Sequence, residues 1–261
     1  MNLKLLTLNL HCLAEENLDD KQNLIVEEII KNDIDIIFLQ EVAQSSDKPI
    51  IYDHVKEDNY GFVLKDKLKN MGYRYNYYFD AFKHSFDKCD EGLAILSKTK
   101  LDLLESKYIS NIKDYNNWKT RKVLIYRMSQ HHINLATSHF GWSDETERFE
   151  EQFDRAIESF KKNELTILAG DFNISYNSKE YHHILKNNFI DIFSKKESFI
   201  NQITFKGDPL NKEHRRLDYF FTNQPVMLID QKILFKDKRV SDHFGVYVEI
   251  KLGDTNETSN L

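Results

Sequence analysis

Short apolar runs bounded by charged or turn-forming residues recur along this sequence, and they constrain its fold more than any other feature. Residues 34–39 (IDIIFL) and 165–169 (LTILA) are rich in Ile and Leu. Such short runs are typical of buried strands. The same reasoning predicts further strands at residues 4–10, 93–97, 122–128, 133–139, 216–222, 227–235 and 244–251. Segments 122–128 and 133–139 are expected to pair antiparallel.

Helical patterns lie between these strands, at residues 21–31, 60–71, 144–162 and 178–188. In the third, Phe149, Phe153, Ile157 and Phe160 recur at steps of four, four and three, which places them on one face. The polar segment 43–60, which carries Pro49, is expected to be a loop. Strands and helices mix without a repeating period, and this favours an α/β sandwich of two sheets covered by helices.

Composition supports one large domain. The 261 residues are 41% hydrophobic and include 18 Phe and 13 Tyr, so they can fill a sizeable core. With 3 Pro, 8 Gly and no linker-like stretch, we expect a single domain over residues 1–252. The polar end, residues 253–261, is expected to be disordered.

Charge and cysteine usage narrow the classes of function. The net charge of −6 disfavours general capture of polyanions, which depends on Lys and Arg. Cys12 and Cys89 fit no metal-binding pattern, and we expect two buried thiols in a reducing compartment. The first residues are interpreted as a strand rather than a signal peptide, and no stretch approaches the roughly 18 apolar residues of a membrane helix. We therefore expect a cytoplasmic protein without a membrane partner.

Polar side chains recur where the predicted strands end or begin. Strand ends share a rim, where such groups can converge on a ligand. Carboxylate and amide oxygens suit a hard divalent cation, a further carboxylate can align a water, and imidazoles paired with carboxylates can donate to phosphate. The set therefore predicts metal-assisted hydrolysis of a phosphate ester. Its members are Asn9, Glu41, Glu91, His139, Asp171, Asn173, Asp218, Asp242 and His243.

The motifs around these residues resemble the endonuclease/exonuclease/phosphatase superfamily from residue 5 to about residue 250. They are TLN, LQEV, EGLAILS, SHF, GDFN, RLDYFF and SDHFG, in this order. The resemblance implies a four-layered αββα sandwich of two mixed β-sheets flanked by helices, of α/β (α+β) class. It places the active site where the two sheets meet at one edge.

The resemblance also implies a role for each matching residue. Glu41 would be the main metal ligand with Asn9 beside it, and Asp242 would help to place a metal or the neighbouring histidine. Mg²⁺ suits these ligands best, with Mn²⁺ as an alternative. Asp171 would activate the attacking water and Asn173 would bind a phosphate oxygen. The remaining residues form two expected pairs, Asp218 with His243 and Glu91 with His139.

Other segments resemble the bacterial sub-group that contains maltose 6'-phosphate phosphatase. They are DNYGFVL, the Tyr/Phe-rich stretch ending in EGLAILSKT, TRKVL, HFGW and VSDHFGV. The resemblance implies a phosphorylated sugar as substrate. An aromatic ring can support a sugar face, and an Arg can grip a terminal phosphate. The residues expected to bind substrate are His84, Arg121, Trp142 and Arg216.

Three alternatives remain open at this stage. A nuclease or DNA-repair phosphodiesterase would use the same catalytic residues and would need a basic, aromatic-lined groove for nucleic acid. A sphingomyelinase-like enzyme would need an exposed apolar hairpin, and none is predicted. A catalytically silent binding module would have lost Glu41, Asp171 or His243. Since no G-x-S-x-G nucleophile motif is present, we expect direct attack by water.

Overall fold

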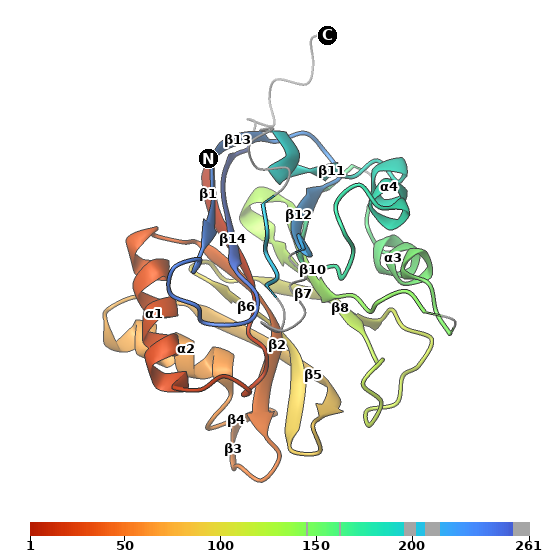
Figure 1. Ribbon diagram of the computed structural model, residues 1–261. Coiled ribbons are helices and arrows are strands. Elements are labelled where there is room, and N and C mark those ends of the chain that lie inside the picture. The colour runs from red at the N-terminus through yellow and green to blue at the C-terminus, as the bar shows by residue number, and fades with distance from the viewer. Residues whose placement is uncertain (145, 162, 196–201, 207–214, 253–261) are drawn as a thin grey trace.

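The computed structural model describes residues 1–144, 146–161, 163–195, 202–206 and 215–252, and two six-stranded sheets form its centre (Figure 1). The first has the order β13 (Met227–Leu234), β14 (Gly245–Lys251), β1 (Asn2–Asn9), β2 (Ile36–Ser45), β6 (Cys89–Ser97) and β5 (Asn76–Ser85). The second has the order β11 (Ile190–Asp191), β12 (Asp218–Thr222), β10 (Leu165–Asp171), β9 (Ile133–His139), β8 (Lys122–Met128) and β7 (Asp102–Tyr108).

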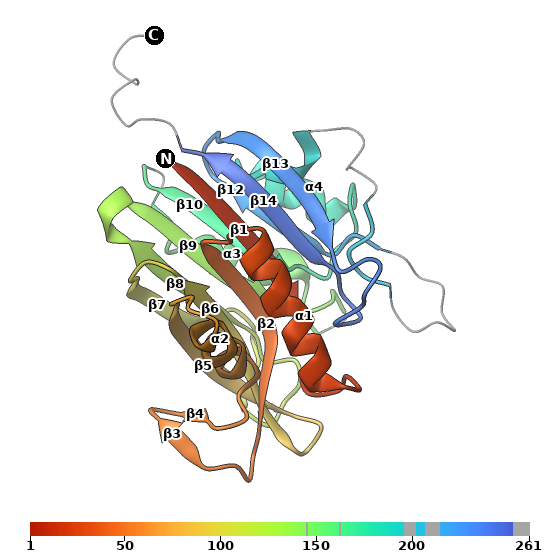
Figure 2. The same ribbon diagram turned by 90° about the vertical axis from the view of Figure 1, so that its left-hand side faces the viewer.

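Helices cover the outer face of each sheet, so the molecule has four layers (Figures 1 and 2). Helices α1 (Leu18–Lys31) and α2 (Tyr60–Asn70) pack on the first sheet, and α3 (Phe149–Ile157) and α4 (Lys179–Lys186) pack on the second. Three apolar clusters fill the spaces between the layers, and the one between the sheets includes Phe38, Ile95, Leu135 and Phe220. The predicted αββα sandwich is confirmed.

Local sequence explains where the helices begin. Asn59 precedes α2, and its side chain accepts a hydrogen bond from the N–H of Phe62. Ser178 caps α4 in the same way through the N–H of Tyr181. Such caps satisfy backbone donors that have no partner within the helix. In α1, Ile25, Val26 and Ile29 form the buried face.

Two parallel strand pairs position the polar residues. Strand β1 runs parallel to β2, and β9 runs parallel to β10. Parallel neighbours run towards the same edge of a sheet, so Asn9 at the end of β1 is in register with Gln40, next to Glu41, and His139 lies beside Asp171. The two sheets therefore deliver their strand ends to a common rim.

Several predicted boundaries differ from the structure. Strands β5 and β7 were not predicted, and the segment expected to be a loop holds the end of β2 and the hairpin of β3 (Ile50–Tyr52) and β4 (Val55–Lys56). This hairpin exposes Ile50, Ile51 and Tyr52, so the expectation that no exposed apolar hairpin exists is wrong. The helix expected over 144–162 is limited to α3, with residues 145 and 162 outside the described part. The tail 253–261 also lies outside it.

Cys12 and Cys89 are both buried and free, as expected. Within the described ranges, no helix is long and apolar enough to cross a membrane.

Candidate active site

Three adjacent strands of the second sheet place three of the predicted catalytic residues side by side. Asp171 at the end of β10 is in register with His139 on β9 and with Asp218 on β12. The strands approach closely because residue 170 is a glycine: a Cβ there would lie 2.0 Å from the backbone oxygen of Ser138. The glycine of the GDFN motif therefore lets β10 approach β9 closely at this point and places Asp171 beside His139.

Glu41 reaches the rim through an irregularity in β2. The pairing of β2 with β6 shifts register between Leu39 and Val42, and Glu41 has a φ of 49°. A bulge re-aims a side chain, and a non-glycine residue in the left-handed region costs free energy that is commonly retained at functional sites. Asn173, in the loop after β10, also has a positive φ, of 52°.

Asn9 joins the two sheets through its amide. Its Nδ2 donates to Glu41 Oε1 at 2.8 Å and to Asp171 Oδ2 at 3.0 Å, while its Oδ1 accepts from the N–H of His11 at 2.9 Å. The amide oxygen is thus engaged away from the two carboxylates. In this arrangement Asn9 orients the carboxylates, and the expected role as a direct metal ligand is not supported.

The pKa values of Asp171 and His243 are both raised, for different reasons. Burial is the main cause that raises the pKa of Asp171, to about 7, and the charge of Asp218 adds to it. Burial alone would lower the pKa of His243, but the charges of Asp218 and Asp171 and a hydrogen bond from its ring outweigh burial and raise it to about 10. His243 Nδ1 donates to Asp218 Oδ2 at 2.8 Å, the expected pairing, and Nε2 lies 3.5 Å from Asp171 Oδ2. His243 is therefore an imidazolium at neutral pH.

His139 is held in the opposite state. Burial, and then the charge of Arg121, lower its pKa well below the ordinary range. The Nδ2 of Asn173 donates to His139 Nε2 at 3.0 Å and to the carbonyl of Phe140 at 2.8 Å. A phosphate oxygen would have to replace one of these bonds before it could bind Asn173. The geometry thus favours Asn173 as the residue that orients a neutral His139, whose Nδ1 lies 3.8 Å from Glu41 Oε1.

The expected pairing of Glu91 with His139 is wrong. Glu91 on β6 is in register with Lys83 on β5, and its Oε1 lies 2.8 Å from Lys83 Nζ. Its Oε2 accepts from Ser85 Oγ and lies 3.5 Å from Cys12 Sγ, which is also 3.5 Å from Glu41 Oε2. A cation that reaches Glu91 from the neighbouring strand takes the place that His139 was expected to occupy.

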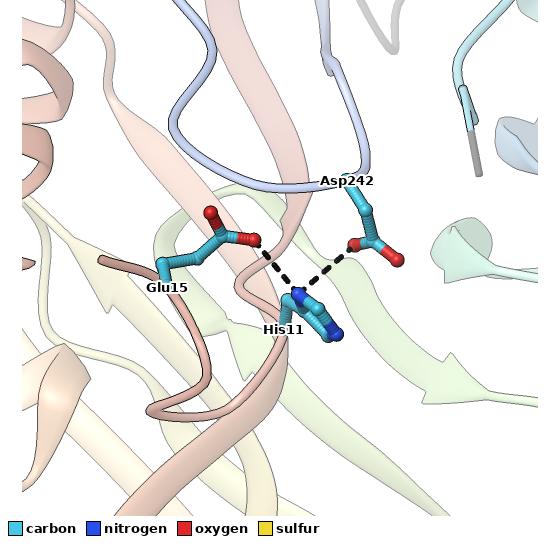
Figure 3. Close-up of side chains that lie close together, drawn as sticks. All are labelled: His11, Glu15 and Asp242. Carbon is cyan, nitrogen blue, oxygen red and sulfur yellow. Dashed lines mark hydrogen bonds and ion pairs between the residues drawn. The ribbon is translucent and has the colours of Figure 1, made fainter. Parts of the chain in front are cut away.

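Asp242 lies beside His11 at the rim. Figure 3 shows the imidazole of His11 between two carboxylates, with Nδ1 2.7 Å from Glu15 Oε1 and 3.7 Å from Asp242 Oδ1. Burial would lower the pKa of His11, but Asp242, Glu15 and Glu41 together raise it. The His11 ring therefore connects Asp242 to the region of Glu41.

Of the four residues expected to bind substrate, Arg121 comes just before β8 and Trp142 just after β9, at the edge of the second sheet where His139 lies. Arg121 is 3% exposed, and its charge acts on Glu91, Glu41 and Asp171. Its Nη1 donates to the carbonyls of Trp118 and Thr120, and its Nε has no hydrogen-bond partner among the described residues. Trp142 follows the end of β9 and is 42% exposed.

The other two are placed elsewhere. His84 follows Lys83 on β5 and so faces the opposite side of the sheet, where its Nδ1 is 3.8 Å from Asp90 Oδ1. Arg216 is buried, with Nη2 2.8 Å from Asp191 Oδ1 and its guanidinium 4.5 Å from the ring centre of Tyr219. An Arg held by a buried carboxylate and an aromatic ring is placed to stabilise the core, and the substrate role expected for Arg216 stays a prediction.

Four residues near the site were not predicted: Lys83, Cys12, His11 and Trp118. His11 and Cys12 directly follow the motif residue Asn9, and this adjacency was the available signal. Lys83 lies on an unpredicted strand, so its register with Glu91 could not be deduced. Trp118 is 61% exposed, and its carbonyl holds Arg121.

The donor groups fit a hard divalent cation. Oxygen or nitrogen atoms of Glu41, His139 and Asp171 lie within 4.8 Å of one another, as do those of His11, Glu15 and Asp242. Burial, followed by the charge of Glu91, raises the pKa of Glu41, so negative charge is concentrated at this point. Mg²⁺ is typically bound by one or two carboxylates together with waters and substrate oxygens.

Comparison with known proteins agrees with this geometry. Residues 6–243 match the model of the Endonuclease/Exonuclease/phosphatase family. The chain belongs to this family. Members of the Endonuclease/Exonuclease/phosphatase family are hydrolases of phosphoesters, and so the rim described above is the expected place for such chemistry. No curated protein matches the chain.

Solved structures of the family share the fold. An endonuclease/exonuclease/phosphatase family protein from Leptotrichia buccalis is 27% identical, with a TM-score of 0.86 over 96% of this chain and 100% of that chain. The human Nocturnin catalytic domain with bound sulfate is 18% identical, with a TM-score of 0.70 over 97% and 94% of the two chains. D. rerio TDP2 with a single-strand DNA product is 18% identical, with a TM-score of 0.67 over 96% and 99%.

Proposed function

We propose that this chain is a divalent-metal-dependent phosphatase that hydrolyses a phosphate monoester, a sugar phosphate such as maltose 6'-phosphate. The observation that carries the proposal is the buried guanidinium of Arg121, whose charge acts on Glu91, Glu41 and Asp171 and whose Nε has no hydrogen-bond partner among the described residues. A fixed guanidinium suits the terminal oxygens of a phosphate group. The sub-group resemblance of the TRKVL and HFGW segments supports the sugar.

Asp171, His243 and Asn9 have separate roles in a direct attack of water on phosphorus. Asp171, with a pKa of about 7, can take a proton from the attacking water near neutral pH, where general bases are most effective. The imidazolium of His243 faces the same carboxylate and can donate to a phosphate or leaving-group oxygen. Asn9 holds Asp171 and Glu41 in fixed orientations.

Glu41 would hold the metal, with Asp242 as a further carboxylate at the rim. Mg²⁺ is the proposed ion and Mn²⁺ the alternative. When bound, the ion would supply positive charge against the phosphate oxygens. Without it, the two nearby carboxylates of Glu41 and Glu91 would repel the substrate.

Exposed indole rings support a sugar as the rest of the substrate. Trp142 and Trp118 are 42% and 61% exposed, and Trp118 belongs to the loop that holds Arg121. Aromatic faces pack well against sugars, and the rings lie in the segments that flank β8 and β9. A cytoplasmic location would suit this proposal because phosphorylated sugars do not cross membranes freely.

The test compares three substrates with Mg²⁺ and then with EDTA: maltose 6'-phosphate, a supercoiled plasmid and a sphingomyelin dispersion. Phosphate release from the sugar alone, abolished by EDTA, is the expected result. Plasmid nicking without sugar hydrolysis would replace the proposal with a nuclease, for which the TDP2 structure with DNA offers a precedent in that protein. Hydrolysis of sphingomyelin alone would assign the exposed β3–β4 hairpin to lipid contact.

A further inference from the structure

A second buried cation, Lys83, lies at the site, and none of the proposed catalytic steps uses it. Lys83 is 5% exposed on β5, a strand at the edge of the first sheet. The pairing of β5 with β6 shifts register between Ala81 and Lys83. Since a bulge changes which way the following side chains point, this irregularity brings Lys83 opposite Glu91.

The charge of Lys83 acts on the site itself. It lowers the pKa of Glu41 and of Glu91, and it also opposes protonation of His139. Arg121 acts on Glu91 and His139 as well. Lys83 and Arg121 therefore approach the same group of residues from different sheets, Lys83 from β5 and Arg121 from the start of β8.

Stability alone is a weak reason for such a pair. A buried ion pair loses its hydration, and replacing it with apolar side chains is often neutral or stabilising. An ammonium group has three N–H donors, whereas Glu91 is the one ion-pair partner of Lys83 in the described ranges. Donors therefore remain for a ligand that enters between Lys83 and the metal ligand Glu41.

The local charge balance indicates which class of ligand Lys83 and Arg121 would bind. Lys83 and Arg121 carry two positive charges, and Glu91, on which both charges act, carries one negative charge, so one positive charge of these three groups is left over. A phosphate monoester is close to a dianion at neutral pH, because its second pKa is about 6. A diester carries one charge and has one terminal oxygen fewer.

We propose that Lys83, together with Arg121, binds a terminal oxygen of the substrate phosphate and so selects a monoester over a diester. This inference rests on the proposed function, and it names the residue that would set its substrate class. Glu91 then acts as a positioning residue that holds Lys83 toward the phosphate. Cys12, between Glu91 and Glu41, joins this group to the metal ligand.

The test measures two quantities in Lys83→Met: the ratio of kcat/KM for p-nitrophenyl phosphate to that for bis(p-nitrophenyl) phosphate, and the affinity for inorganic phosphate by calorimetry with Mg²⁺. Loss of a charged donor predicts a fall of about 10- to 100-fold in both, and Lys83→Arg should recover part of it. A ratio and an affinity within twofold of the unsubstituted protein would overturn the inference.

Lys56→Met is the matched control. Lys56 is another buried lysine, with Nζ 2.6 Å from Asp90 Oδ2, the carboxylate next to Glu91 in sequence. Its loss removes an equivalent ion pair and should leave the ratio unchanged; an equal fall would overturn the inference. Should Lys83→Met fail to fold, Lys83→Met in a Glu91→Gln background, compared with Glu91→Gln alone, makes the same comparison without an unpaired charge.

The two proposals fail in different ways. Hydrolysis of neither maltose 6'-phosphate nor either model ester by the unsubstituted protein would refute the proposed function, and phosphate affinity would still decide the role of Lys83. Hydrolysis of the monoester with no dependence on Lys83 would leave the function standing and remove Lys83 from it.

Discussion

The charge of His243 depends on Asp218, and removing that carboxylate provides a sharp test of the site. Asp218 is fully buried, and its Oδ2 accepts the Nδ1–H of His243 at 2.8 Å. The structure raises the pKa of His243 from its ordinary 6.5 to about 10, with Asp218 the largest favourable cause. At about 1.4 kcal/mol for each pKa unit, this preference for the imidazolium is on the order of 5 kcal/mol.

Asp218→Asn should therefore lower the pKa of His243 toward or below neutrality, because burial then acts against the charge with only Asp171 and Asp242 to oppose it. The imidazolium would be lost at pH 7, and we expect kcat to fall about 100- to 1000-fold, the usual cost of one electrostatic donor. The alkaline limb of the pH–rate profile should move to lower pH, because the imidazolium of His243 then loses its proton at a lower pH.

The assay combines a pH–rate profile for p-nitrophenyl phosphate with NMR titration of the His243 ring. Asp35→Asn is the matched control: Asp35, just before β2 begins, pairs with Lys98 at 3.0 Å. The control should leave both readouts unchanged. A His243 ring that still titrates near 10 in Asp218→Asn, or a rate above half of the original, would refute the reasoning.

Three further substitutions test the metal ligand Glu41, the base Asp171 and the core residue Arg216 separately. Glu41→Gln should keep the fold but lose Mg²⁺ affinity and several orders of magnitude in rate; Mg²⁺ titration by calorimetry checks this, and near-normal rates would remove Glu41 from the role. Asp171→Asn should stay folded and bind metal without turnover. In the unsubstituted protein the rate should fall as pH drops through about 7, because Asp171 becomes protonated and can no longer act as the base. A rate that does not fall at acid pH would contradict this. Arg216→Met should leave KM unchanged but lower the free energy of unfolding by about 3–5 kcal/mol, because it breaks the buried ion pair between Arg216 and Asp191. Urea denaturation measures this change, and a raised KM at unchanged stability would reverse the assignment.

Most of the sandwich could be predicted from sequence because its central strands are buried on both faces. Runs such as Ile36–Leu39 in β2 and Leu165–Ala169 in β10 have no solvent-exposed face that would need polar residues, so nearly every position is apolar. The residues at the ends of these strands were then easy to place, since parallel neighbours end together. Asp171 and His139 lie close together for this reason. His243 lies just before β14, which runs antiparallel to β1 and so begins at the edge where β1 ends.

The edge strands β5 and β7 could not be predicted in the same way. β5 (NYYFDAFKHS) and β7 (DLLESKY) mix aromatic, acidic and basic residues because one face is partly open to solvent. Missing β5 concealed the register of Lys83 with Glu91, and this is why His139 was given the wrong partner. The substrate role predicted for Arg216 rested on its proximity to Asp218 in sequence. That proximity does not reveal the contact of Arg216 with Asp191, which lies on β11.

Hydrolysis of maltose 6'-phosphate in oxygen-18 water with Mg²⁺ tests the central claim most directly. Direct attack of an Asp171-activated water on phosphorus predicts label in the released phosphate, none in the sugar, and no release with EDTA or in Asp171→Asn. Label in the sugar, release that survives EDTA, or the absence of any release would contradict the account.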